Sequence, residues 1–262
     1  MQRVKTFVKW FLILVVVPFG TPQLISYASG YPDGQRSWST ARRDASGLSP
    51  SPQDHREAVV QVFGARTWGW RGTFAVHTWL AVKDRDAPHY TRYEVLGWRA
   101  YRGGSALAVG RGSPDNHWYG SAPELLADLR GTAAEQVIAR LPQVIGTYPH
   151  KSEYRLWPGP NSNSFIAYIG RNFPELKLDL PPTAIGKDYL ANGEITGPAI
   201  SGDGFQLSLM GYGGFLVSPE QGMELHVLGL TAGFDFDDLA LKVPGFGRLA
   251  LKGRPEQQGY TR

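Results

Sequence analysis

The sequence contains no cysteine, and this absence excludes several classes of protein. A disulfide framework, a thiolate metal site and a cysteine nucleophile all require a side chain that the chain does not have. The absence does not exclude an oxidising compartment. Roughly 200 residues of ordinary globular composition are enough to bury a sizeable core without disulfide bonds.

The chain also has no excess of charge in its body. The first 45 residues hold six basic and two acidic residues, which accounts for the whole net charge of +4 in a chain of 262 residues. The remainder is neutral, and no basic stripe with interleaved aromatic residues runs through it, so we expect no nucleic-acid partner. The histidines show no metal-ligand spacing and no complete phosphate-binding loop is present. We therefore expect no metal and no cofactor.

The first 28 residues have the pattern of an export or anchoring segment. Three basic residues precede an uncharged apolar run over residues 10–19. This order is typical of a signal peptide, for which Ser26 and Ala28 offer the small side chains of a cleavage site. The alternative is an uncleaved membrane anchor over residues 10–28, because a spanning helix needs about 17–25 residues. Both predict a body outside the cytoplasm, in the periplasm or attached to the inner membrane of the cell envelope.

The remaining chain divides into a tether, one domain and a tail. Residues 29–55 are rich in Gly, Ser and Pro, which predicts a tether. The alternative is an ordered arm that lies across the domain, with Trp38 as its anchor. Residues 56–252 are expected to form a single domain, and residues 253–262 a polar tail.

Spacing patterns in the body predict an α+β domain, with an antiparallel sheet and helices. Strands are expected at residues 58–63, 73–83, 90–98, 205–210 and 223–230. The strands at 73–83 and 90–98 are expected to pair as a hairpin. Helices are expected from Ser121 to Arg130, from Thr132 with a kink or split at Pro142, and over residues 164–171.

A histidine on the second predicted strand is one candidate for catalysis. Alternation puts His77 and Trp79 on the face opposite to the bulky aliphatic side chains. Glu94, on the next strand of the hairpin, is a candidate to orient the imidazole of His77. This relation depends on the hairpin register, since a slip of one residue moves Glu94 to the other face. The alternative is that His77 is packed among other side chains and has no catalytic role.

The start of the predicted helix at residues 161–164 is the second candidate. A nucleophile benefits there, because backbone N–H groups and the helix dipole stabilise its anion and a developing oxyanion. Ser162 is the candidate nucleophile and His77 its base. The neighbouring residues assigned to binding are Asn161, Asn163 and Ser164. The alternative is plain helix capping, for which Asn and Ser are also favoured.

Tryptophans are concentrated in the same region. Six of the eight lie between residues 68 and 157. Such residues usually build a core or border a cleft. We expect Trp79 and Trp157 to line a groove for a ligand or peptide.

Several motifs resemble a bacterial family of unknown function. They cover residues 68–72, 75–79, 157–165 and 180–189 and are rich in Trp, Pro and Gly. They resemble domain of unknown function 3750 over residues 58–249. The resemblance implies an exported or membrane-attached envelope protein and no established activity.

The order of the candidate residues is similar to that of circularly permuted papain-like peptidases and acyltransferases. Those proteins carry Asn-Cys-x-x-Phe at a helix start; Asn161, Ser162 and Phe165 fit this pattern, with serine in place of cysteine. The resemblance implies a hydrolase or acyltransferase that acts on peptidoglycan peptides or lipid acyl groups. A serine hydroxyl is less ionised than a thiol and depends more on its base, His77. The alternative function is a non-catalytic binding or scaffolding module of the cell envelope.

Overall fold

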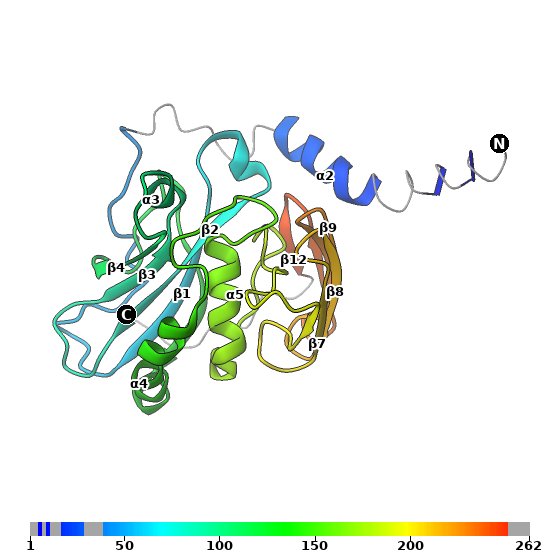
Figure 1. The fold of residues 1–262 in the computed structure, drawn as a ribbon. Helices are drawn as coiled ribbons and strands as arrows, with labels where there is room; N and C mark the ends of the chain where they lie inside the picture. Colours follow the sequence, from blue (N-terminus) through cyan, green and yellow to red (C-terminus); the bar gives the residue numbers. More distant parts are fainter. Residues whose placement is uncertain (1–4, 7–8, 11–16, 29–38, 251–262) are drawn as a thin grey trace.

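The structure is a computed structural model that describes residues 5–6, 9–10, 17–28 and 39–250. In this part of the chain two antiparallel sheets lie on either side of helix α5 (Ser162–Asn172) (Figure 1). The predicted α+β class with antiparallel strands is confirmed, although the strands form two sheets rather than one.

The first sheet has five strands and carries the N-terminal half of the body. Its order is β4-β3-β2-β1-β5, formed by β1 (Val59–Arg66), β2 (Val76–Lys83), β3 (Thr91–Val95), β4 (Leu107–Arg111) and β5 (Glu124–Arg130). The strands predicted at 58–63, 73–83 and 90–98 are β1, β2 and β3, and β2 pairs with β3 as the predicted hairpin. Helix α4 (Gly131–Thr147) packs on β1 and β5, and α5 packs on β2 and β3.

Three short helices complete this half. The 3-10 helix η2 (Gly69–Thr73) precedes β2, and α3 (Gly97–Tyr101) follows β3. Because β2 and β3 are antiparallel, both short helices lie at the same end of the sheet. A second 3-10 helix, η3 (Pro174–Leu176), follows α5.

The second sheet is a meander of seven strands in sequence order. Its strands are β6 (Thr196–Gly197), β7 (Phe205–Ser208), β8 (Gly213–Ser218), β9 (Gly222–Val227), β10 (Leu230–Asp235), β11 (Ala240–Val243) and β12 (Gly247–Ala250). Each strand pairs with its neighbours along the chain. The strands predicted at 205–210 and 223–230 correspond to β7 and β9.

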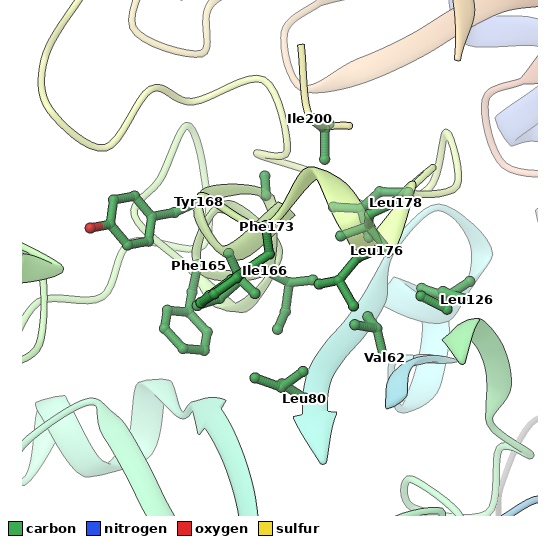
Figure 2. Close-up of a cluster of buried hydrophobic side chains, with 14 of the residues drawn as sticks. Val62, Leu80, Leu126, Phe165, Ile166, Tyr168, Phe173, Leu176, Leu178 and Ile200 are labelled. Carbon is green, nitrogen blue, oxygen red and sulfur yellow. The ribbon is translucent and has the colours of Figure 1, made fainter. Parts of the chain in front are cut away.

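The main core fills the space between the first sheet and α5 (Figure 2). Val62 and Leu80 from the strands and Phe165 and Ile166 from the helix are fully buried. Burying a side chain of this kind contributes roughly 1.5–3 kcal/mol. Every residue of α5 from its first to Gly170 is buried, as expected for a helix covered by sheets on two sides.

The helix predicted from Ser121 to Arg130 is wrong. Its leucines lie in β5, which pairs with β1 over almost its whole length. The apolar spacing of Leu126 and Leu129 suits a helix locally, but pairing along the edge of β1 satisfies the backbone and still buries Leu126. The next predicted helix is α4, which begins at Gly131 and is not split at Pro142.

Residues 39–55 contact the face of the first sheet opposite to α5. Ser49 Oγ donates to Gln61 Oε1 at 2.7 Å, and the Tyr90 hydroxyl donates to the Pro50 carbonyl at 3.0 Å. Leu48 N donates to the carboxylate of Asp115 at 2.6 Å. Residues 39–55 therefore form an ordered arm across the domain, which is the alternative to the predicted tether. Trp38, the expected anchor of this arm, lies outside the described residues.

Helix α2 (Val17–Ala28) is the described part of the predicted signal or anchor segment. It has 12 residues and contacts β10 and η2. No helix in the described ranges combines the length and the apolar character needed to cross a membrane. Much of the apolar run at 10–19 and the whole tail at 253–262 lie outside the described residues, so both assignments stay predictions.

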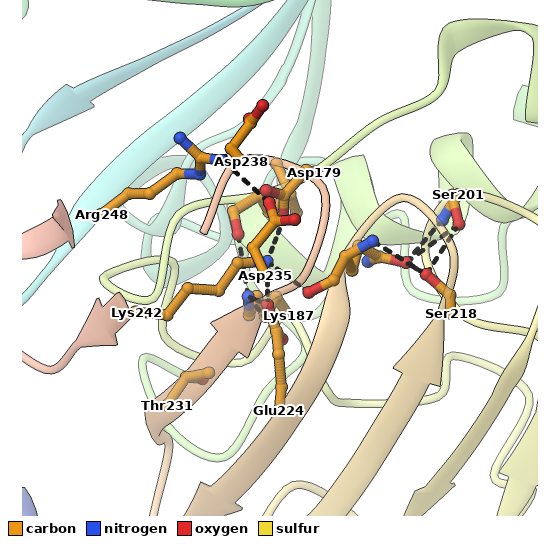
Figure 3. A network of polar contacts seen from close by, with 12 residues as sticks. Asp179, Lys187, Ser201, Ser218, Glu224, Thr231, Asp235, Asp238, Lys242 and Arg248 are labelled. Atoms are coloured by element: carbon orange, nitrogen blue, oxygen red, sulfur yellow. Dashed lines mark hydrogen bonds and ion pairs between the residues drawn. The ribbon is translucent and has the colours of Figure 1, made fainter. Parts of the chain in front are cut away.

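A buried cluster of charges fastens the second sheet to the rest of the body (Figure 3). Glu224 on β9 lies 2.8 Å from the ammonium of Lys187 and 2.6 Å from that of Lys242. Lys242 also binds Asp179 at 2.7 Å, and all four side chains are at most 6% exposed. Two ammonium groups therefore meet two carboxylates away from water, which is the condition under which buried charges are tolerated.

The cluster sets the protonation of Glu224. Burial raises the pKa of this carboxyl, but Lys187 and Lys242 outweigh burial and bring the pKa from 4.5 to about 2. Because the folded pKa lies below the unfolded one, the stability that Glu224 contributes is present above pH 4.5. It is lost as the pH falls toward about 2.

We expect Glu224→Gln to lower the free energy of unfolding by about 3–5 kcal/mol, because the change leaves two buried ammonium groups with one carboxylate. Urea unfolding at pH 7 measures this loss. The matched control is Glu220→Gln, which removes an exposed pair with Lys177 and should cost less than about 1 kcal/mol. Equal losses for the two variants would contradict the role of the cluster.

Candidate functional site

A cavity of about 500 Å³ opens where β2 begins and β3 ends. This volume falls in the range of about 300–1,000 Å³ that is typical of small-molecule sites. Its walls are largely apolar with several aromatic side chains, and its lining includes His77 together with the start of α5. The aromatic lining residues are Trp68, Trp98, Tyr101, Trp118, Tyr119 and Tyr154.

The hairpin register brings His77 and Glu94 together. Leu80 pairs with Tyr93, so alternation places both His77 and Glu94 on the opposite face of the sheet. His77 Nε2 lies 3.0 Å from Glu94 Oε2. Arg92 donates to the same carboxylate oxygen at 2.9 Å. The carboxylate is thus held from two sides and fixes one nitrogen of the imidazole.

The surroundings of His77 favour a neutral ring. Burial lowers the pKa of His77, and the neighbouring Glu94 offsets this only in part. The ring is stacked on Trp118 with centroids 3.8 Å apart. A neutral ring that donates Nε2–H to Glu94 carries its lone pair on Nδ1. No hydrogen bond joins Nδ1 to any residue that the structure describes, so this nitrogen is available as a base.

Burial acts on Glu94 in the opposite direction. It raises the pKa of this carboxyl, but the contacts with His77 and Arg92 outweigh it, and the net shift is downward. Glu94 is therefore ionised at neutral pH and acts as an acceptor toward both neighbours.

Asn161 and Ser164 form the capping box of α5. Asn161 Oδ1 accepts from the backbone N–H groups of Asn163 at 2.9 Å and Ser164 at 3.0 Å. Ser164 Oγ accepts in return from Asn161 N at 2.8 Å. Gly186 packs so closely on this cap, with a φ of +84°, that a Cβ there would lie 2.5 Å from Asn161 Nδ2. Asn161 and Ser164 therefore cap the helix, which is the alternative to the binding role predicted for them.

Asn163 ties the start of α5 to β2. Its Nδ2 donates to the carbonyls of Val76 at 3.1 Å and Ile185 at 2.9 Å, and its Oδ1 accepts from Thr78 Oγ1 at 3.0 Å. The amide is therefore fully used in these contacts, although it borders the cavity. Its backbone N–H is also occupied by Asn161, so it does not contribute to an oxyanion site.

Ser162 differs from its three neighbours because its hydroxyl makes no hydrogen bond with the described residues. The residue lines the cavity and is 4% exposed. Its backbone N–H has no acceptor in the described part of the chain either, and it lies at the positive end of the α5 dipole. Ser162 therefore combines a free hydroxyl with a free amide at one point of the cavity wall.

His77 and Ser162 border the same cavity without a hydrogen bond between them. Thr78 Oγ1 donates to the Ser162 carbonyl at 3.3 Å, which places Ser162 against the α5-facing side of β2. His77 is next to Thr78 in sequence and faces the other side. The two candidate groups thus enter the cavity from opposite faces at the start of one strand.

The two tryptophans predicted to line a groove lie elsewhere. Trp79 is fully buried, donates to the Pro114 carbonyl at 2.6 Å and stacks on Phe63. Trp157 is 39% exposed and packs edge-on against Tyr212, with centroids 5.0 Å apart. Neither contributes to the lining of this cavity.

Sequence reasoning missed most of the aromatic wall. Trp118 lies in a loop between β4 and β5, where no periodicity signals which way a side chain points. Trp98 lies in the first turn of α3, three residues after the end of the strand that carries Glu94, and this proximity is the signal in the sequence that could have identified it. Within the described ranges, no three His, Asp or Glu side chains are grouped in a way that could hold a metal ion.

Comparison with known proteins places the chain in a family. The model of the family "protein of unknown function (DUF3750)" matches residues 57–189, half of the chain. The chain belongs to this family. The match includes every residue that lines the cavity, from Thr67 to Ile185, and ends before the second sheet. No curated protein and no solved structure matches the chain.

We expect Glu94→Gln to lower the pKa of His77 further, because the change removes the charge that raises it. An NMR titration of the histidine ring signals measures the shift of the midpoint. Glu124→Gln is a matched control, because Glu124 is exposed on β5 and makes no contact with His77. An unchanged midpoint in Glu94→Gln would contradict the coupling between the two side chains.

Proposed function

We propose that this family member is a cell-envelope hydrolase or acyltransferase with a permuted papain-like site in this cavity. Ser162 is the nucleophile, His77 the base, and Glu94 the residue that positions the base. One observation supports this assignment most: the free hydroxyl of Ser162 and the Glu94-held ring of His77 border the same cavity.

The chemistry follows from the atoms left free. His77 Nδ1 takes the proton of Ser162 Oγ while this oxygen forms a bond to the acyl carbon of the substrate. The Ser162 N–H and the α5 dipole stabilise the resulting oxyanion. The leaving group departs with the proton from His77, and water or a second acceptor then takes the acyl group from Ser162. Catalytic hydrogen bonds often tighten when substrate is bound, which is compatible with the separated pair described above.

The lining of the cavity favours one of the two expected substrate classes. Arg71 is the one charged side chain among the described lining residues, because the buried imidazole of His77 is neutral. Trp98, Trp118 and Tyr154 offer flat apolar surface. This composition suits a lipid acyl group better than a peptidoglycan peptide.

We expect a fluorophosphonate probe, which forms a covalent bond with activated serines, to label the wild-type protein. Ser162→Ala should abolish labelling because the bond-forming oxygen is removed, and His77→Ala should slow it by roughly 100-fold or more, the usual contribution of a general base. Mass spectrometry of the intact chain measures both. Ser121→Ala is the control serine, near Trp118 but outside the cavity lining. Labelling that survives in Ser162→Ala would refute the assignment.

The rate of labelling should depend on pH through His77. Burial lowers the pKa of this ring below its usual 6.5, so the neutral base persists into mildly acidic solution. The rate should therefore stay level from pH 8 to pH 6.5 and fall at lower pH, as Nδ1 becomes protonated. The rate is measured at each pH from samples in which labelling is quenched at fixed times. A decline centred above pH 6.5 would contradict a buried, neutral base.

The second candidate function is a non-catalytic binding or scaffolding module. It is favoured by the absence of a hydrogen bond between Ser162 and His77 and by the aromatic wall of the cavity. In that case a fluorescent acyl ester should bind and remain intact, and Trp98→Ala should weaken its binding. If the wild-type protein releases the acyl group and Ser162→Ala does not, the result supports the enzyme and excludes a module that only binds.

A further inference from the structure

The outward face of the second sheet is apolar from β7 to β12. One row of paired residues crosses six strands and consists of Phe205, Val217, Met223, Phe234, Leu241 and Leu249. Five of these side chains, all except Phe234, are between 40% and 54% exposed. Apolar surface of this continuity is rare on soluble monomers and marks an interaction site.

A second row lies beside the first and has the same character. Leu207 pairs with Phe215, Phe215 with Leu225, and Leu225 with Ala232. Alternation along β7 to β12 assigns an apolar residue or glycine to every outward position of these described strands. No charge therefore interrupts this face, which we call the outer face.

The inner face of the same sheet has the opposite character. It carries the buried Glu224, His226 and Lys242 that face the first half of the body. An antiparallel sheet with one face in water normally turns its apolar side inward and its polar side outward. Here the polarity is reversed, so water is not the expected neighbour of the outer face.

The position of α2 indicates which neighbour replaces water. This helix contacts β10, and its Gln23 lies close to Gly245 in the turn between β11 and β12. Its Leu24 and Tyr27 are 71% and 66% exposed. The uncharged run at residues 10–19 leads into this helix, and three basic residues precede the run. Apolar side chains beside basic ones match the acyl layer and anionic head groups of a membrane surface.

Aromatic side chains occur at the same end of the sheet. Trp157 packs on Tyr212, which lies in the turn before β8, and it also touches the turn at Gly229, where β10 begins. Both rings are partly exposed. Trp and Tyr are enriched where a protein meets the head-group region of a bilayer.

We propose that the outer face of the second sheet, together with α2, seats the protein on the surface of a lipid bilayer. The sheet does not span the bilayer; it presents its apolar side chains to the acyl boundary while the buried ion cluster stays on the protein side. This contact is independent of the enzymatic assignment. Within it, the sheet adds a second membrane contact to the predicted N-terminal segment, of which α2 is the described part.

Single cysteines test the proposal cleanly, because the chain has none of its own. The variants Leu225→Cys and Phe215→Cys place one fluorophore on the outer face, where the native residues are 50% and 42% exposed. Val109→Cys is the matched control, because Val109 is 53% exposed on β4 of the other sheet. The full-length chain is mixed with vesicles of phosphatidylcholine and phosphatidylglycerol that carry bromine in their acyl chains, which quenches nearby fluorophores.

The proposal predicts several-fold stronger quenching at positions 225 and 215 than at 109, with unchanged circular dichroism for all three variants. Equal quenching, or none at 225 and 215 while the chain sediments with vesicles, would mean that the N-terminal segment alone binds the membrane. Chains that fail to bind vesicles would overturn the proposal as well. Self-quenching between copies labelled at 225 in the absence of lipid would identify a second copy of the chain as the occupant, and the proposal would fail.

Discussion

The side chain of Asn163 is the contact on which the geometry of the cavity depends. It holds two carbonyls and one hydroxyl, from β2 and from the loop at Ile185, and so fixes the start of α5 against the first sheet. The direction in which Ser162 faces, and its distance from His77, follow from this attachment. A helix start that moved along β2 would separate the hydroxyl from the cavity and leave three buried polar groups without partners, which is costly.

The features that the sequence predicted correctly are those that depend on local periodicity. Alternation in the second strand placed His77 and the aliphatic residues on opposite faces, and the hairpin brought Glu94 to His77 at 3.0 Å. The helix at residues 164–171 is contained in α5, whose cap residues are the Asn and Ser of the sequence motif. In each case neighbours along the chain determine the outcome, so the pattern is sufficient.

The features that were missed depend on partners far away in the sequence. The leucines of β5 have helical spacing, but the free edge of β1 decides their conformation. Trp79 and Trp157 were expected in one groove, yet the sheet lies between the core around Trp79 and the second half of the body. The reversed polarity of the second sheet could not be predicted from the sequence either, because alternation separates the two faces of a strand without indicating which face is buried. That choice is made by Asp179 and Lys187, which lie outside the sheet and bind its charged side.

The same ion cluster has a consequence for the limits of the family. Lys187 lies within the range that the family model matches, whereas its carboxylate partner Glu224 lies beyond it. A fragment that stopped at residue 189 would retain the ammonium and lose the group that neutralises it. The end of the family match is therefore not a folding boundary in this chain. Recombinant protein for biochemical work has to extend through β11, where Lys242 completes the cluster.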